Sequence, residues 1–583
     1  MIENLRNIAI IAHVDHGKTT LVDKLLRQSG TLERNELDTE RLMDSNDQEK
    51  ERGITILAKN TAINWHDHHI NIVDTPGHAD FGGEVERVMS MVDSVLLLVD
   101  AVDGPMPQTR FVTQKAFQAG LRPIVVVNKV DRPGARPDWV VDQMFDLFDN
   151  LGATEEQLDF PIVFASAING MAGLEHDNLA EDLTPLFQAI VDNVPAPNVD
   201  REGPFQMQIS ALDYNSFLGV IGVGRIARGR ITPNTPVIAI DTEGKRRNGR
   251  ILKLMGHHGL HRVDVEEAAA GDIVCISGFD QLFISDTLCD PLNVEAMIPL
   301  SVDEPTVSMT FQVNDSPFCG REGKYVTSRN IKERLDRELL YNVALRVEEG
   351  DSADKFKVSG RGELHLSVLI ETMRREGFEM AVGRPEVIIR VIDGEKQEPF
   401  ENVTIDLEEQ HQGGMMEQMG LRKGDLTNMV PDGKGRVRLE YTIPARGLIG
   451  FRNQFLTMTS GSGIITSIFS HYGPLKSGEM FGRQNGVLVS VATGKALTYS
   501  LETLQARGKL FLGHGDEVYE GMLLDNMRAS GKDETIALVP PIRYTLEQAL
   551  EFIEDDELAE ITPKSIRLRK KLLSENERKR SGK

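Results

Sequence analysis

The sequence predicts a multidomain fold in which an α/β domain, a β-barrel and α+β domains follow one another. A chain of 583 residues is too long for a single hydrophobic core and should form about four to six domains. Its first part alternates apolar strand-like runs with amphipathic stretches, and after Pro195 and Pro197 the pattern changes to short strands separated by glycines. The composition, with 40% hydrophobic and 26% charged residues, is that of a globular protein.

Residues 1–200 are expected to form a doubly wound α/β domain. Apolar runs rich in β-branched residues, separated by helical stretches, predict buried parallel strands rather than hairpins. The strands are expected at Ile8–Ala12, Ile70–Asp74, Ser94–Asp100, Pro123–Asn128 and Ile162–Ala165, with helices at Thr19–Gln28, Gly83–Met91 and Gln108–Ala119 between them.

The later domain boundaries follow changes in this pattern. Residues 201–302 carry short strands such as Phe205–Leu212 and Gly219–Arg228, which predict a β-barrel. Strands and helices mix in residues 303–393 and again in residues 394–480, which predicts two α+β domains. Residues 481–583 hold further strands, a helix at Thr545–Ile553 and a basic tail.

Composition excludes several classes of protein. No apolar run approaches the roughly 18–20 residues that cross a bilayer, and the first residues lack the apolar stretch of a secretory signal. The three cysteines form no CxxC pair and are expected to be reduced thiols. We therefore expect a cytoplasmic protein with no membrane contact.

The net charge of −24 argues against a nucleic-acid partner, but two stretches of the sequence contain an excess of basic residues. Each stretch alone is equally well explained as a solvated face. With an RNA partner, each would supply phosphate contacts. The RNA-binding candidates are Lys434, Arg436, Arg438, Arg446 and Arg452 in the first stretch, and Lys564, Arg567, Arg569, Lys570 and Lys571 in the second.

Residues 12–20 have the context of a phosphate-binding loop, because they follow a predicted strand and open a helix. Lys18 would reach the β- and γ-phosphate oxygens, and the Thr19 hydroxyl would bind Mg²⁺. Ala12 stands where the general pattern has glycine, so this loop alone leaves an ATPase or a chance match open. The phosphate-binding candidates are Asp15, His16, Gly17, Lys18, Thr19, Thr20 and Gly77.

Two further segments suit the γ-phosphate and its metal ion. Asp74 ends a predicted strand and is expected to hold Mg²⁺ through water, while the Gly77 N–H meets the γ-phosphate. Thr55 lies in a charged segment and is suited to be the second hydroxyl ligand of Mg²⁺, ordered only when the γ-phosphate is present.

A third group of residues points to guanine. The carboxylate of Asp131, in Asn128-Lys129-Val-Asp131, can accept hydrogen bonds from both N1–H and the 2-amino group of guanine, which adenine does not offer in that arrangement. Asn128 would add polar contacts and the Lys129 stem would cover the base. Ser166 and Ala167 follow another predicted strand, where a backbone N–H would meet O6. The motifs together predict a P-loop domain that binds GTP with Mg²⁺.

These motifs resemble those of the translational GTPases. The resemblance rests on residues 13–20, on Arg52-Gly-Ile-Thr55 and on Asp74-Thr-Pro-Gly-His78, and alanine at position 12 is normal in that superfamily. It implies that His78 is the catalytic residue and orients the attacking water, where other GTPases carry glutamine. Later segments resemble domains two, three and five of elongation factor G, with no match to its long fourth domain.

The sequence resembles the BipA (TypA) family over almost its whole length. The resemblance rests on residues 43–53, 104–110, 131–139 and 446–452. It implies a P-loop GTPase domain, a β-barrel, two ferredoxin-like α+β domains and a BipA-type C-terminal domain. It also implies a GTPase that works on the ribosome (70S, 50S or 30S), contacts ribosomal RNA and A-site transfer RNA, and assists large-subunit assembly or translation in cold or other stress. A monomer is expected, and the guanine and diphosphate contacts would also permit guanosine tetraphosphate.

One departure from the family lies after Leu524, where BipA proteins usually carry a polar and basic loop of about twenty residues. Here the chain passes directly into Asp525, so the contact that this loop implies with transfer RNA is in doubt. Two alternatives stay open: a LepA-like elongation factor, and a GTP-gated RNA- or ribosome-binding module in which hydrolysis serves only release.

Overall fold

The fold is known from a computed structural model of the chain. The structure describes residues 3–13, 15–31, 47–52, 55–215, 218–300, 304–342, 344–392, 394–431, 435–478, 483, 486–527 and 539–581. The chain divides into two units: the first is formed by residues 1–303 and 340–343, and the second by residues 304–339 and 344–583.

The first unit begins with the predicted α/β domain, whose seven-stranded sheet has the order β2-β3-β1-β4-β5-β6-β7. The strands β3, β1, β4, β5 and β6 are parallel, and the edge strands β2 and β7 are antiparallel to their neighbours. Their bounds are β1 Leu5–Ala12, β2 Lys59–Trp65, β3 His68–Asp74, β4 Ser94–Asp100, β5 Arg122–Asn128, β6 Ile162–Ser166 and β7 Met171–Gly173. The five strands expected from the sequence are confirmed, with bounds within three residues of those predicted.

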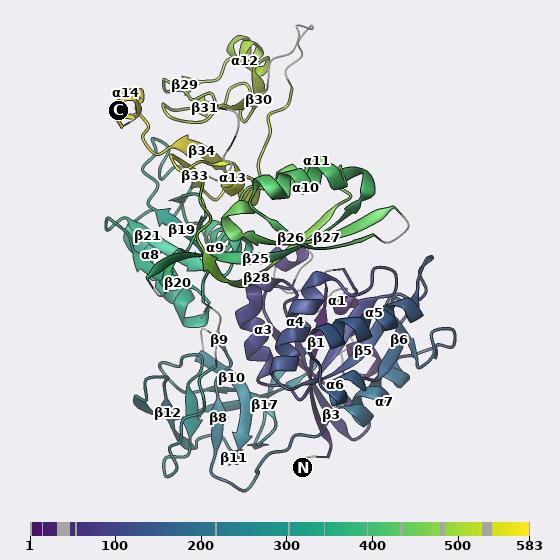
Figure 1. The fold of residues 1–583 in the computed structure, drawn as a ribbon. Helices are drawn as coiled ribbons and strands as arrows, with labels where there is room; N and C mark the ends of the chain where they lie inside the picture. Colours follow the sequence, from purple (N-terminus) through teal and green to yellow (C-terminus); the bar gives the residue numbers. More distant parts are fainter. Residues whose placement is uncertain are drawn as a thin grey trace. The chain divides into compact units, whose positions relative to one another are not determined.

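Helices flank this sheet (Figure 1). They are α1 Lys18–Gln28, α2 Asp47–Arg52, α3 Gly82–Met89, α4 Pro107–Gln118, α5 Pro137–Asn150, α6 Glu155–Leu158 and α7 Thr184–Asn193. Burial along the whole length of strands such as β1 and β4 explains why apolar residues follow one another there instead of alternating with polar ones, because helices cover both faces of a parallel sheet.

The second part of this unit is the predicted barrel domain, an antiparallel sheet of nine strands with a short separate pair. Its strands are β8 Gln206–Gln208, β9 Ala211–Asn215, β10 Gly219–Arg228, β11 Arg230–Ile231, β12 Pro236–Ile240, β13 Arg246–Arg250, β14 Lys253–His258, β15 His261–Asp264, β16 Ala268–Ala269, β17 Ile273–Ser277 and β18 Thr287–Cys289. The turn of the β14–β15 hairpin pairs with edge strand β2, because the Gly259 N–H donates to the Ala62 carbonyl at 2.8 Å. The barrel therefore covers an edge of the first sheet that would otherwise expose unpaired backbone groups.

The second unit contains a sheet built from two distant parts of the sequence, with the order β20-β21-β19-β22-β33-β34 and β23 beside β19. Its strands are β19 Val307–Gln312, β20 Arg346–Glu349, β21 Lys355–Gly360, β22 Met380–Val382, β23 Glu386–Val387, β33 Glu557–Ile561 and β34 Ile566–Lys570, with helices α8 Ser328–Tyr341, α9 Glu363–Glu376 and α13 Leu546–Phe552. In Figure 1 the yellow strands β33 and β34 lie beside α13 and continue the teal sheet. Two strands from residues 481–583 therefore complete the sheet that begins in residues 303–393.

A further α+β domain in this unit has β24, β27 and β28 around the long strand β25, with β26 at the outer edge of β27. The elements are β24 Arg390–Ile392, β25 Glu395–Glu408, α10 Gln412–Leu421, β26 Asp425–Pro431, β27 Arg436–Pro444, α11 Arg452–Met458 and β28 Ile464–Pro474. Met415 and Met419 of α10 and Phe455 of α11 are buried with alternate residues of β25 and β27. The two helices thus cover one face of this sheet.

Residues 486–527 form a small lobe, which we call the C-terminal lobe. It contains β29 Gly494–Lys495, α12 Thr498–Gln505, β30 Gly508–Leu510, β31 Glu517–Val518 and β32 Asp525–Met527. Outside the lobe, helix α14 Glu575–Ser581 follows β34. Its own core is small and centres on Leu501, Leu510 and Leu512. None of the helices in the described part of the chain combines the length and the apolar character that crossing a membrane requires.

Candidate nucleotide site

Strand β1, a loop and helix α1 follow one another in the order that the sequence predicts for a phosphate-binding loop. Gly17 caps α1 with φ 95°, and a Cβ on it would lie 2.6 Å from Asn128 Nδ2. Only glycine tolerates both the left-handed backbone and this close approach. The first turn of α1 that follows carries the backbone N–H groups of Lys18, Thr19 and Thr20, the arrangement that binds phosphate oxygens.

The phosphate lysine and the predicted metal carboxylate lie side by side. Lys18 Nζ is 2.7 Å from Asp74 Oδ1 and also donates to the Thr75 carbonyl. The Thr75 hydroxyl in turn donates to the Ile10 carbonyl at 2.5 Å, which fastens the loop after β3 to β1. Two motifs separated by more than fifty positions thus meet at one edge of the sheet, as parallel strand ends require.

The side chains predicted to bind Mg²⁺ carry the oxygen atoms that this ion prefers as ligands. Thr19 and Thr55 offer hydroxyl oxygens and Asp74 a carboxylate, and hard divalent cations take oxygen ligands. Asp74 is 1% exposed, and its Oδ1 accepts no hydrogen bond of suitable geometry from the described residues apart from its ion pair with Lys18. Thr55 is 8% exposed and lies between α2 and β2. No cluster of three or more His, Cys, Asp or Glu side chains within the described ranges suits a different metal.

His16, expected to bind phosphate, lies in a different setting. Its imidazole is 2% exposed and stands edge-on to His13 at 5.2 Å between ring centroids. Burial, reinforced by His13, lowers the pKa of His16 to about 3, so the ring is neutral at physiological pH. Its backbone N–H donates to the His13 carbonyl at 3.2 Å. The His16 side chain therefore packs inside the protein, and the phosphate contact expected of His16 stays a prediction.

His78 follows Gly77 in the loop after β3. Its Nδ1 accepts from the Asp80 N–H at 3.2 Å and lies 3.6 Å from Asp80 Oδ1, and its ring meets Phe81 edge-on. Asp80 thus engages Nδ1, which leaves Nε2 as the other ring nitrogen for a water molecule or partner. Gly77 beside it is buried.

The guanine motif also holds the site together. Asn128 Nδ2 donates to the His16 carbonyl at 2.8 Å, and its Oδ1 accepts from the Ala167 N–H at 2.9 Å. Lys129, at φ 62°, donates from Nζ to the Asp15 carbonyl at 2.5 Å. The Asn128 amide thus links the loops after β1, β5 and β6, and its expected polar contacts with the base stay a prediction.

Asp131, Ser166 and Ala167 complete the predicted base-reading set. Asp131 is exposed, so its carboxylate is accessible to a base, whereas Ser166 and Ala167 are buried at the end of β6. Asp131 lies three residues after the end of β5. Both strands end at the same edge of the sheet as β1 and β3, so every nucleotide motif is carried by one edge.

Asp100 is a site residue that the motifs did not reveal. It ends β4, is fully buried, and has Oδ2 2.7 Å from Lys129 Nζ while Oδ1 accepts from the Val102 N–H at 2.8 Å. Burial alone would raise the pKa of Asp100, but these two hydrogen bonds outweigh it and the pKa lies below its ordinary value. An acidic residue closing an apolar strand was the signal available in the sequence.

Family models match this domain order. The Elongation factor Tu GTP binding domain matches residues 3–196 and Elongation factor Tu domain 2 matches residues 219–289. The Elongation factor G C-terminus matches residues 395–480, and the TypA/BipA C-terminal domain matches residues 485–525 and 523–575.

Relatives match over the full length. A protein of Escherichia coli K12 named "Large ribosomal subunit assembly factor BipA" is 69% identical over 600 aligned positions, which cover 100% of this chain and 99% of the relative. Proteins of the same name from Haemophilus influenzae and Buchnera aphidicola are 68% and 59% identical, and the chain covers 97% and 99% of them. The chain belongs to the BipA family. A crystal structure of a Thermus thermophilus protein shares the fold alone, with a TM-score of 0.55 at 17% identity over 81% of this chain and 97% of that one.

The match to the BipA C-terminal domain is interrupted after Leu524, where the sequence lacks the loop that BipA proteins usually carry. Its two parts meet at residues 523–525, directly at Leu524. The alignments with the relatives run over more positions than the chain has residues, so the relatives contain residues without a counterpart here. Both findings agree with the absence of a family loop at this point.

The first basic stretch of this BipA protein is largely paired with its own domain. Arg438 lies 3.0 Å from Asp406, and Arg446 Nε lies 2.5 Å from the fully buried Glu398. Arg436 Nη2 contacts the Ser462 carbonyl at 3.3 Å. Arg452, at the start of α11, is exposed, whereas Lys434 lies outside the described residues.

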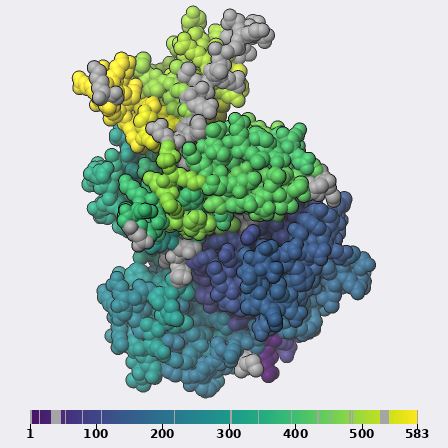
Figure 2. Space-filling view, viewed as in Figure 1, coloured from purple at the N-terminus to yellow at the C-terminus, as the bar shows by residue number. Residues whose placement is uncertain are grey.

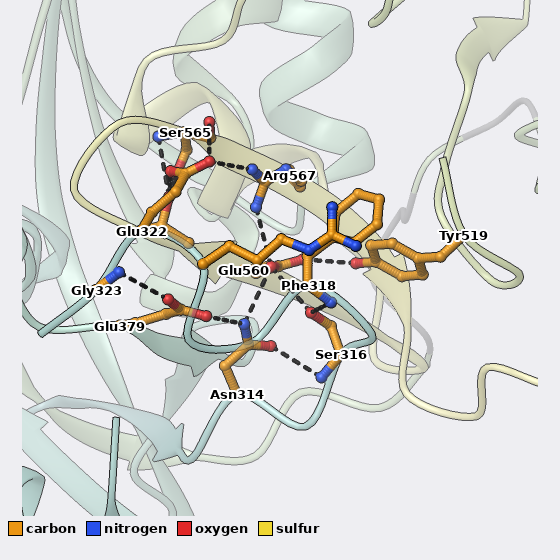
Figure 3. Close-up of polar contacts among 12 residues, drawn as sticks. Asn314, Ser316, Phe318, Glu322, Gly323, Glu379, Tyr519, Glu560, Ser565 and Arg567 are labelled. Atoms are coloured by element: carbon orange, nitrogen blue, oxygen red, sulfur yellow. Dashed lines mark hydrogen bonds and ion pairs between the residues drawn. The ribbon is translucent and has the colours of Figure 1, made fainter. Parts of the chain in front are cut away.

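In the second basic stretch, the two arginines of strand β34 lie on one face of the strand and pair with carboxylates. Arg569 is fully buried and paired with Asp315, and Arg567 lies 3.0 Å from the buried Glu560. Figure 3 shows Arg567 reaching both Glu322 and Glu560. Arg567 and Arg569 thus pair with carboxylates of the protein itself, and their expected contacts with RNA phosphates stay a prediction.

The remaining basic residues near the C-terminus are differently placed. Lys570 lies 2.8 Å from both Asp556 and Glu557, whereas Lys564 and Lys571 are exposed. The segment that carries them lies at the molecular surface, in yellow in Figure 2. Lys564 and Lys571 are thus the accessible members of the second stretch.

Proposed function

We propose that this BipA-family protein is a ribosome-associated GTPase that binds GTP with Mg²⁺, hydrolyses it to GDP and phosphate, and assists assembly of the large ribosomal subunit. The observation that carries the proposal is the meeting of Lys18, Asp74 and the Asn128–Lys129 pair at one edge of the sheet. The name shared by the full-length relatives supports the assembly role.

Within this proposal each motif has one task. The α1 N-terminus and Lys18 bind the β- and γ-phosphates, and Asp131 reads the guanine edge. Thr19, Thr55 and Asp74 would hold Mg²⁺, which neutralises charge developing on the phosphate oxygens. His78 orients the attacking water through Nε2, because its Nδ1 is occupied by the Asp80 N–H.

The finer parts of the proposal concern partners and setting. We include in the proposal that the protein binds 70S, 50S and 30S particles and contacts ribosomal RNA and A-site transfer RNA. We also include that it acts in the cytoplasm, as a monomer, under cold or other stress. Guanosine tetraphosphate fits the same guanine and diphosphate contacts. Exposed Arg452, Lys564 and Lys571 are the side chains best placed for RNA phosphates.

The test compares the wild-type protein with His78→Ala. We expect both to bind GTP far more tightly than ATP, and only the wild-type protein to show GTP turnover stimulated by ribosomes, because His78 acts on water rather than on the nucleotide. Nucleotide affinities come from titration, and turnover comes from phosphate release with and without 50S and 70S particles.

The same experiment distinguishes the alternatives. Equal uptake of ATP and GTP would end the proposal, and stimulated turnover that survives in His78→Ala would end the role of His78. Cells that lack the protein and grow in the cold should accumulate incomplete large subunits, visible in sucrose gradients. If His78→Ala restores normal particles in these cells, the protein is a GTP-gated ribosome ligand rather than a hydrolysis-driven factor.

A further inference from the structure

Glu49 is a buried carboxylate that no nucleotide motif explains. It lies in α2 and is 1% exposed, with no exposure of the side chain itself. A carboxylate is costly to bury unless its oxygens are paired, so its partners indicate what the burial serves.

Those partners follow Thr55 directly in the sequence. Glu49 Oε1 accepts from the Ile56 N–H at 2.9 Å and from the Leu57 N–H at 3.2 Å. The Ile56 N–H belongs to the peptide group that also contains the Thr55 carbonyl. Because that peptide group is planar, the Glu49 carboxylate fixes the backbone immediately after Thr55.

The other oxygen of Glu49 connects this segment to the sheet. Oε2 lies 2.5 Å from Lys59 Nζ, and Lys59 is the first residue of β2. In the β2–β3 ladder, Lys59 pairs with Asp74, the predicted magnesium carboxylate. Glu49 therefore connects the Thr55 segment with the register position of Asp74.

We propose that Glu49 is a positioning residue that holds Thr55 in place relative to Asp74 and so favours the GTP-bound state over the GDP-bound state. The proposal rests on the proposed function, in which the Thr55 hydroxyl is used only when a γ-phosphate is present. Loss of Glu49 should then weaken binding of a GTP analogue without weakening binding of GDP.

The test measures the affinities of the full-length protein for GDP and for a non-hydrolysable GTP analogue with Mg²⁺. For Glu49→Ala we expect analogue affinity to fall about tenfold while GDP affinity stays within about twofold, as for lost hydrogen bonds to a charged group. Glu49→Gln keeps an oxygen acceptor for the two N–H groups and should lose less. Asp47→Ala, in the same helix at an exposed position, is the matched control and should change neither affinity.

A double variant separates positioning from general stability. Thr55→Ala should lower analogue affinity by itself, and adding Glu49→Ala should lower it no further, because the two residues act through one contact. Equal losses for GDP and analogue, unchanged affinities for both, or fully additive losses would overturn the proposal. If Glu49→Ala fails to fold, the same ratios measured for Glu49→Gln decide the matter. Wild-type protein that binds no guanine nucleotide would instead overturn the proposed function.

Discussion

Single buried polar residues decide how the nucleotide site is shaped. Asp100 and Asn128 contact other parts of the protein, and through them Lys129 and the loop of Asp15 to Gly17 are held in place. Lys129 and Asp15 both have positive φ, at 62° and 64°. Such backbone strain persists only where surrounding contacts impose it, and here those contacts are the Asn128 and Lys129 side chains.

Buried histidine makes the stability of the first unit depend on pH. His257 of β14 is 7% exposed and lies 3.7 Å from Cys275 Sγ, and burial lowers its pKa to about 4 from 6.5. Because the folded pKa lies below the unfolded one, unfolding takes up a proton between these values. The contribution of neutral His257 is complete above pH 6.5 and is lost as pH falls toward 4, at about 1.4 kcal/mol per pH unit.

We predict that urea unfolding of the wild-type protein shows lower stability at pH 5.5 than at pH 7. His257→Gln should reduce this difference by about 1 kcal/mol, because glutamine does not titrate. His258→Gln is the control, since the neighbouring imidazole is exposed. An identical pH dependence in wild-type and His257→Gln proteins would contradict the assignment.

At the scale of elements, strand β34 shows why a basic sequence is an uncertain guide to RNA binding. Alternate side chains of a strand point to opposite faces, so Arg567 and Arg569 share one face of β34. That face meets Glu322, Glu560 and Asp315. The exposed lysines lie just outside the strand, where no neighbouring element of the described chain buries them.

Charge reversal should separate the two groups. The double variant Lys564→Glu with Lys571→Glu is expected to weaken cosedimentation with ribosomes while its melting temperature stays unchanged. A plot of the logarithm of the binding constant against the logarithm of salt concentration should also become less steep, by about one per lost phosphate contact. Arg569→Met is expected to lower the free energy of unfolding by about 2 kcal/mol, because it removes the hydrogen bonds of a fully buried guanidinium. Unchanged cosedimentation of the lysine variant would remove this surface from the ribosome interface.

At the scale of the whole molecule, helix α13 and strands β33 and β34 complete the hydrophobic core of the second unit. Leu550, Ile561 and Leu568 share one hydrophobic core with Phe311 and Ile370, and β33 pairs with β22. The C-terminal lobe joins this core through a buried polar group. Figure 3 shows Glu560 accepting from Tyr519, Asn314, Ser316 and Arg567.

We predict that Tyr519→Phe loosens the C-terminal lobe while leaving the α/β domain unchanged. It removes the 2.6 Å hydrogen bond to Glu560 but keeps the ring packed on Phe318, so the cost should be about 1 kcal/mol. Amide hydrogen exchange should speed up in residues 486–527 and stay constant in the nucleotide domain. Truncation before Leu546 provides the extreme case and should expose residues 304–393 to proteolysis. Unaltered exchange in Tyr519→Phe would show that the hydrogen bond between Tyr519 and Glu560 does not hold the lobe in place.

The sequence alone determined the parallel strands, the loops after them and the residue types of a GTP site, because these signals are local. A strand followed by a glycine-containing loop and a helix specifies its own geometry, and parallel strands bring their ends to one edge. Only the tertiary structure decided that His16 is packed inside, that Glu49 anchors the segment after Thr55, and that β34 turns Arg567 and Arg569 inward. These features depend on partners far away in the chain, and burial of a charged or polar side chain is set by what packs against it.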